Sequence, residues 1–219
     1  MKKYILFLLL LFVVACSNDN VSSSEQGKGD IEKEEKNAPA NKDTRTEEEI
    51  EREGRLAEVG DIAEDELGKV ELLNIANINE VIEHGPLEID FVNAKIIKWS
   101  DMPSDILNEV SRFGDVTDGE FDYLQIKMIV ENTSDEDISW YGIDNLVTDK
   151  KQQIDGVSEE FLGNYVDSDY LGNVKKEYVL GYILNDSDIK DLRIVFSYVD
   201  ELNTYERIAE KLDYELNFE

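Results

Sequence analysis

The feature that most constrains the fold of this chain is an alternation of apolar and polar residues that runs from about residue 67 to residue 219. Clear examples are 124–130, 192–198 and 212–218. This period is typical of strands that bury one face. The segment 178–184 is apolar on both faces apart from Gly181, which predicts a central strand. We therefore predict a single mainly β domain over residues 67–219.

Turn signals and one helical segment refine this prediction. Asp118-Gly119 and 132–135 are rich in turn residues and separate predicted strands. Apolar residues within 103–113 repeat at helical spacing, with a proline at the start and Gly114 after the end. Many short strands with polar turns indicate an antiparallel, immunoglobulin-like β-sandwich with one short inserted helix. We expect Trp99 and Trp140 in its core, the alternative being an exposed ligand groove.

Two segments are less regular. Leu87, Ile89 and Phe91 share one face of a predicted strand, but Ala94 and Ile96 continue it with the opposite parity. A β-bulge near residues 92–93 explains such a switch. The segment 70–78 is compatible with either a strand or a helix.

The N-terminus predicts export and a lipid anchor. Lys2 and Lys3 precede an apolar run at 4–14 that is too short to span a bilayer, and Ala15 precedes Cys16. This arrangement resembles the signal family of bacterial lipoproteins. The resemblance implies that residues 1–15 are removed and that Cys16 carries a diacylglyceryl group. Two acyl chains hold a protein durably on a membrane, so we expect an extracytoplasmic, membrane-anchored protein.

Residues 16–66 are predicted to form a disordered acidic linker. The stretch 17–60 is rich in Ser, Asn, Glu, Lys and Gly, and buries too little apolar surface to offset the entropy of ordering. Thr46 and Glu49 fit a capping box. We expect at most a transient helix over about 46–58.

The domain also resembles a family of uncharacterised immunoglobulin-like domains on Gram-positive lipoproteins. The resemblance rests on the strand–turn–strand stretch 123–138, on 171–173 before the next strand, on 191–196, and on 84–87 before the first long strand. It implies a sandwich similar in fold to that of a secreted mycobacterial antigen. It implies no established activity and no catalytic residues.

Net charge excludes one class of function. The chain has 51 acidic and 22 basic side chains, for a formal charge of −29. Nucleic-acid binding requires a basic surface, so we expect no nucleic-acid partner. The charge is compatible with a solvated acidic coat, or with attraction to cations or a basic partner.

No catalytic set is apparent. His84 is the only histidine, and it lies beside Gly85-Pro86, where a turn is expected. The sequence contains no Gly-x-Ser-x-Gly motif whose nucleophile His84 could activate. One histidine and one cysteine cannot build a zinc site. A carboxylate-based hydrolase stays open, because sequence cannot select two acidic residues from so many. Because no catalytic set is apparent in the sequence, we predict that the protein is not an enzyme.

Calcium is the metal that the sequence favours most, because calcium prefers oxygen ligands. Alternating aspartates in three turns are the candidates. The alternative is that they are solvated turn residues with no bound ion. None of the turns matches an EF-hand loop. The candidates are Asp135, Asp137, Asp167, Asp169, Asp186 and Asp188.

These observations favour a non-enzymatic binding module, tethered in the cell envelope and engaging another envelope protein or a small ligand. The alternative is a lipoprotein that captures a small ligand or cation for a transporter. That class usually has two α/β lobes, and no repeated βα pattern is present here.

Overall fold

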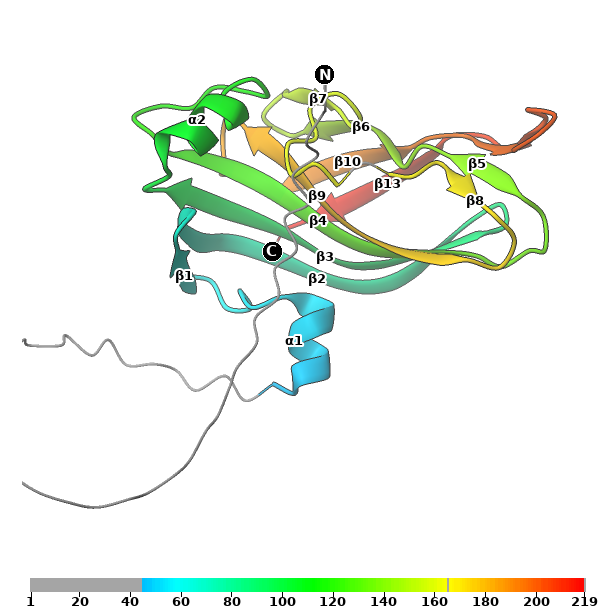
Figure 1. Ribbon diagram of the computed structural model, residues 1–219, viewed down its shortest axis with the longest axis horizontal. Helices are drawn as coiled ribbons and strands as arrows, with labels where there is room; N and C mark the ends of the chain where they lie inside the picture. Colours follow the sequence, from blue (N-terminus) through cyan, green and yellow to red (C-terminus); the bar gives the residue numbers. More distant parts are fainter. Residues whose placement is uncertain (1–44, 165, 219) are drawn as a thin grey trace, which may run out of the picture. The chain divides into compact units, whose positions relative to one another are not determined.

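A computed structural model describes residues 45–164 and 166–218, and these form a mainly β structure of antiparallel strands (Figure 1). The predicted fold class is therefore confirmed at the level of a mainly β, antiparallel domain. Residues 1–15 and Cys16, predicted to be a signal peptide and a lipidation site, lie outside the described residues.

One layer is a five-stranded sheet with the order β1-β2-β3-β4-β9. Its long strands match the segments with period-two or fully apolar patterns, and the ambiguous segment 70–78 is part of β2. All neighbours in it pair antiparallel. The strands are β1 (Ile62–Asp65), β2 (Gly68–His84), β3 (Leu87–Ser100), β4 (Phe121–Asn132) and β9 (Lys175–Leu184).

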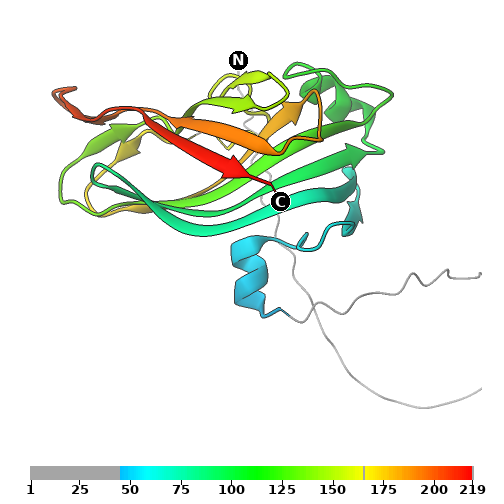
Figure 2. The same ribbon diagram turned by 180° about the vertical axis from the view of Figure 1, so that it is seen from behind.

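The second layer consists of two four-stranded sheets, ordered β13-β10-β6-β7 and β12-β11-β5-β8. Figure 2 shows β10 and β13 lying across the long strands of the first layer. The strands are β5 (Ile138–Trp140), β6 (Ile143–Thr148), β7 (Gln153–Asp155), β8 (Asp169–Tyr170), β10 (Asp191–Phe196), β11 (Val199–Glu201), β12 (Arg207–Ala209) and β13 (Leu212–Asn217).

The main hydrophobic core lies between the layers. It joins apolar side chains of β3, β4 and β9 to those of β5, β6, β10 and β13. Trp140 is fully buried there, as predicted, with its ring 6.3 Å from Tyr170 and 6.1 Å from Phe196. Trp99 instead packs against a second, smaller cluster beside Phe121 and donates from Nε1 to the carbonyl of Leu67 at 3.1 Å.

The predicted bulge in β3 is present. The register against β4 shifts between Phe91 and Asn93, and Phe91, Val92, Asn93 and Ala94 are all buried. The shift lets apolar residues of β3 face the core on both sides of the bulge. It also turns Asn93 and Lys95 toward the outer face of the sheet, where α1 covers them.

Two short helices accompany the sheets. α2 (Ser104–Val110) follows Pro103, its N-cap, and lies within the predicted helix 103–113. α1 (Glu47–Glu53) has the predicted capping box of Thr46 and Glu49. Neither of these two helices, the only ones among the described residues, has the length and hydropathy needed to cross a bilayer.

The ordered part of the chain begins earlier than the sequence predicted. Within the expected linker 16–66, α1 contacts β3, and β1 pairs with β2 from Ile62↔Glu71 to Asp65↔Gly68. The linker prediction is therefore corrected for residues 45–66. These residues carry few apolar side chains, and they become ordered because polar groups of the sheet bind their backbone.

Candidate functional site

The second layer bends at one point, and the candidate site lies there. Tyr141 and Gly142 connect β5 to β6 and do not belong to either strand. They lie opposite Ser197 and Tyr198, which connect β10 to β11. The Ser197 N–H donates to the Gly142 carbonyl at 2.8 Å, and the Tyr141 N–H donates to Ser197 Oγ at 3.0 Å. These bonds replace the regular ladder and hold the Tyr141 side chain outward, where it is 58% exposed.

The connection between β7 and β8 packs onto this bend. Gly142 has φ +77°, and a Cβ there would lie 2.6 Å from Cγ2 of Val166, so the close approach requires glycine. Asp155 caps the start of the connection by accepting from the N–H groups of Val157 and Ser158 at 3.0 and 2.8 Å. These bonds hold the pKa of Asp155 below its usual value.

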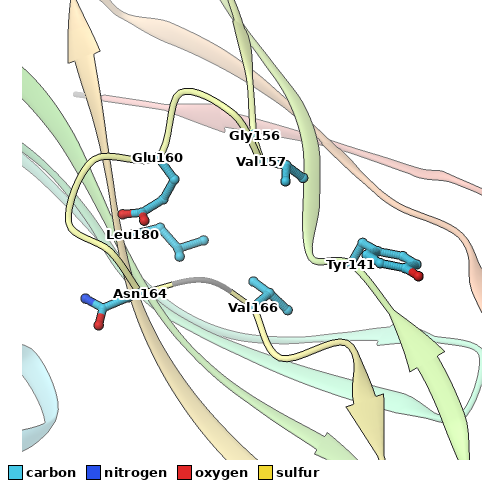
Figure 3. Close-up of a pocket in the computed structure, with 7 residues that line it drawn as sticks. All are labelled: Tyr141, Gly156, Val157, Glu160, Asn164, Val166 and Leu180. Carbon is cyan, nitrogen blue, oxygen red and sulfur yellow. The ribbon is translucent and has the colours of Figure 1, made fainter. Parts of the chain in front are cut away.

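Between the bend and this connection is a small pocket of about 50 Å³. Figure 3 shows Tyr141, Val157 and Val166 on one side of it, with Glu160 and Leu180 on the other. Val157 is 51% exposed, so the mouth presents apolar surface to solvent. The volume is sufficient for the end of one side chain or a few water molecules, but is far below the several hundred Å³ of drug-sized ligand sites.

Glu160 is the chemically distinctive residue of the pocket, because its side chain is only 2% exposed. Its Oε1 accepts from the N–H groups of Leu162 at 2.9 Å and Gly181 at 3.1 Å. Its Oε2 has no hydrogen-bond donor among the described residues. Burial raises the pKa of Glu160 above its usual value, and the backbone N–H groups around it oppose that shift.

The same connection covers the free edge of β9. The Phe161 N–H donates to the Gly181 carbonyl at 3.1 Å, and Asn164 Nδ2 donates to the Val179 carbonyl at 2.8 Å. An isolated bridge joins Glu160 to Tyr182. An open strand edge can pair with another chain, and this connection protects that part of β9. Glu160 therefore has a structural role in addition to lining the pocket.

His84 is the last residue of β2, and its side chain is buried. Its Nε2 lies 2.8 Å from the Ser197 carbonyl. Burial lowers the pKa of His84, and the bond to Ser197 opposes this. The residue joins the first layer to the bend of the second.

The six aspartates proposed for calcium are not brought together. Asp135 accepts from Asn173 at 2.6 Å, and Asp167 pairs with Lys176 at 2.9 Å. Asp169 accepts from Ser168 at 2.9 Å, Asp186 from the Asp188 N–H at 2.9 Å, and Asp188 lies 3.5 Å from Lys150. The backbone carbonyl of Asp137 accepts a hydrogen bond from the Leu202 N–H at 3.0 Å. No group of three or more His, Cys, Asp or Glu side chains that could hold a metal occurs in residues 45–164 and 166–218.

A wider hollow of about 400 Å³ lies near the start of β4. Its lining is mostly polar and includes Asp115, Asp118, Glu120 and Asp122. Lys98 pairs with Glu120 at 2.7 Å, which neutralises part of this charge. Acidic side chains on an already acidic surface do not by themselves indicate a ligand.

Sequence reasoning did not identify the pocket. Tyr141 and Val157 lie in connections without a strand or helix period, and Glu160 is one of 51 acidic residues. The available signal was local: Glu160 is followed by Phe161-Leu162-Gly163, an apolar pair and a glycine inside an otherwise polar connection.

No protein-family model matches the chain, and no curated protein does. Similar solved structures include the yjhA protein of Bacillus subtilis, at 18% identity over 64% of this chain and 97% of that one, with a TM-score of 0.42. A functionally unknown protein of Listeria monocytogenes EGD-e has 10% identity over 69% and 89%, with a TM-score of 0.44. A conserved hypothetical protein of Bacillus anthracis has 10% identity over 62% and 98%, with a TM-score of 0.36.

Proposed function

We propose that this chain is a lipid-anchored, extracytoplasmic, non-enzymatic module that binds a basic protein of the cell envelope through the pocket at Tyr141, Val157 and Glu160. The observation that carries the proposal is an exposed apolar mouth above a buried carboxylate, on a chain with net charge −29. Exposed aromatic and aliphatic anchors around a small pocket are the usual centre of a protein interface. The acidic surface around it attracts a partner of opposite charge.

The pocket chemistry favours binding over catalysis. Hydrolysis by paired carboxylates needs a second acid at a set distance, and Glu160 is the one carboxylate among the described residues that line the pocket. A basic side chain from a partner could instead bond to Glu160 Oε2, which lacks a donor within the described chain. An apolar contact on Tyr141 and Val157 would exclude water from that bond.

Capture of a small cation is the second candidate, and the same unpaired oxygen favours it. The volume of about 50 Å³ restricts such a ligand to the size of an ammonium or methylammonium ion. A transporter-associated capture protein for larger substrates is not supported by a pocket of this size.

The fold within this proposal is an immunoglobulin-like sandwich of the Gram-positive lipoprotein type. Support comes from the two-layer antiparallel arrangement and from the strand–turn–strand stretch 123–138.

The binding surface is tested with the detergent-solubilised full chain as bait in native envelope extract. The site variant is Tyr141→Ser with Val157→Ser, and the control is Tyr205→Ser with Leu171→Ser, which removes similarly exposed apolar residues elsewhere. We expect one stoichiometric basic partner to be retained by the wild type and the control, and to bind the site variant at least ~10-fold more weakly. Equal retention of that partner by the site variant contradicts the proposal.

The anchor is tested separately. We expect Cys16→Ser to abolish incorporation of a clickable fatty acid and to move the protein from the detergent phase to the aqueous phase in Triton X-114 partitioning, because the thiol is the acceptor of the lipid. Unchanged partitioning of the variant would show that Cys16 does not carry the anchor. The binding result above does not depend on this outcome.

A further inference from the structure

The short helix α1 is held on the outer face of the five-stranded sheet almost entirely by polar contacts. None of its residues is buried. After the helix, Leu56 is partly buried against the second hydrophobic cluster. Most segments of a domain are held by apolar burial, so the stability of this one depends on its hydrogen bonds and ion pairs.

Two lysines of the sheet bind the end of α1. Lys95 Nζ on β3 donates to the carbonyls of Glu53 at 2.5 Å and Leu56 at 2.6 Å. Lys127 Nζ on β4 donates to the Glu51 carbonyl at 2.6 Å. These carbonyls lie in and just after the last turn of the helix, where the backbone lacks internal partners and the helix dipole is negative. The ammonium groups therefore act as a cap supplied by the sheet.

Further polar contacts complete the attachment. Arg52 forms a bidentate pair with Asp90, at 2.8 and 3.0 Å. Asn93 Nδ2 donates to the Glu53 carbonyl at 3.1 Å. The bonds of Asp90 and Asn93 both join β3 to α1.

The attachment has a cost that an apolar contact would not have. Lys95 is 2% exposed, and burial, with the nearby cations Arg45 and Lys127, lowers its pKa to about 8 despite Glu53 and Asp61. Asn93 Oδ1 is buried without a hydrogen-bond partner among the described residues. Desolvated charge and an unpaired acceptor both offset the gain from the polar bonds. A helix of seven residues is also unstable by itself in water.

We propose that residues 45–57 form a releasable latch, which unfolds when it leaves the sheet and uncovers a polar face made of Asp90, Asn93, Lys95 and Lys127. The latch lies within the segment 16–66 that the sequence predicts to be a disordered linker. Release would lengthen the connection between the predicted anchor and the domain, and would expose two lysines on an otherwise acidic protein. The inference does not depend on the pocket or on its partner.

Limited trypsin digestion of the full chain, followed by mass spectrometry, tests the latch. Arg52 lies within α1, so trypsin can cut after it only when the latch is released, whereas cutting after Arg193 within β10 reports global unfolding. Arg55 is exposed beyond the helix, so cleavage after it is not counted. We expect the wild type to be cut within the latch at least ~10-fold faster than after Arg193. Equal, slow cleavage at both places would show that the segment is a fixed part of the domain and would overturn the proposal.

The lysines are tested in the same assay. Lys95→Met with Lys127→Met should accelerate cleavage after Arg52 by about 10-fold or more, because the helix carbonyls lose their donors. Lys98→Met is the matched control, since Lys98 lies on the same strand as Lys95 but pairs with Glu120.

Asp90→Asn removes only the pair with Arg52 and should also accelerate cleavage within the latch. The role of the lysine and Asp90 contacts is contradicted if latch cleavage stays unchanged in both the double lysine variant and Asp90→Asn. It is also contradicted if latch cleavage rises only in parallel with cleavage after Arg193.

Discussion

Ser197 joins three parts of the molecule through three different atoms. Its N–H donates to the Gly142 carbonyl, its hydroxyl accepts from the Tyr141 N–H, and its carbonyl lies 2.8 Å from His84 Nε2. The first two bonds fix the bend in the second layer, and the third connects that bend to the end of β2. The mouth of the pocket therefore depends on a buried imidazole in the opposite layer.

This arrangement predicts a pH dependence of stability. Because burial lowers the pKa of His84, the folded protein binds the imidazole proton more weakly than the unfolded chain does. Stability from this residue is thus fully present above its ordinary pKa of about 6.5 and is lost as the pH falls through the folded value. We expect the free energy of unfolding in urea to fall more between about pH 7.5 and about pH 5 in the wild type than in His84→Gln, which keeps a donor but does not titrate.

Parallel pH profiles for the two proteins would show that His84 is not responsible.

Sequence could place some residues and not others for clear physical reasons. Trp140 was expected in the core because a large apolar ring next to an alternating strand has few other stable positions, and it is buried. Glu160 could not be selected, because its burial depends on the approach of Gly181 on β9, a strand that only the fold brings to this connection. His84 was expected in a turn, but its side chain is buried at the end of a strand.

At the scale of elements, hydrophobic period was a reliable guide to the strands of the core. β4, β9, β10 and β13 coincide with the segments that alternate or are apolar throughout, and the bulge in β3 follows from a switch of parity. Period failed for α1 and β1, since these elements bury little apolar surface. α1 is ordered by lysine and asparagine side chains of distant strands, and β1 by its backbone pairing with β2. No local sequence pattern reports either contact.

The contribution of these two elements can be measured with two chains that start at residues 45 and 67. We expect the shorter chain to fold but to have a free energy of unfolding lower by roughly 2–5 kcal/mol, because it loses the β1 pairing, the Leu56 contact and the partners of Lys95. Chemical denaturation followed by tryptophan fluorescence reports the difference, with Trp99 near the removed segment. Identical midpoints and slopes for the two chains would mean that residues 45–66 add no stability.

At the scale of the whole molecule, charge and core are separated in space. The chain carries a net charge of −29, yet the core between the layers is built from apolar side chains. Repulsion between acidic groups opposes compactness, and the fold has no disulfide within the described residues to offset it. Apolar burial between two layers is therefore the main source of stability, which is the reason that period-two alternation predicted the fold class.

The two-residue connection Gly85-Pro86 between β2 and β3 has a consequence for the order of folding. It joins strands of 17 and 14 residues that are neighbours in both sequence and space. Closing such a short loop is fast, whereas the pairing of β4 with β9 must bring Asp122 to Leu184 across the intervening second-layer strands. We expect the hairpin of β2 and β3 to form early and to serve as the template on which β4, and last β9, assemble.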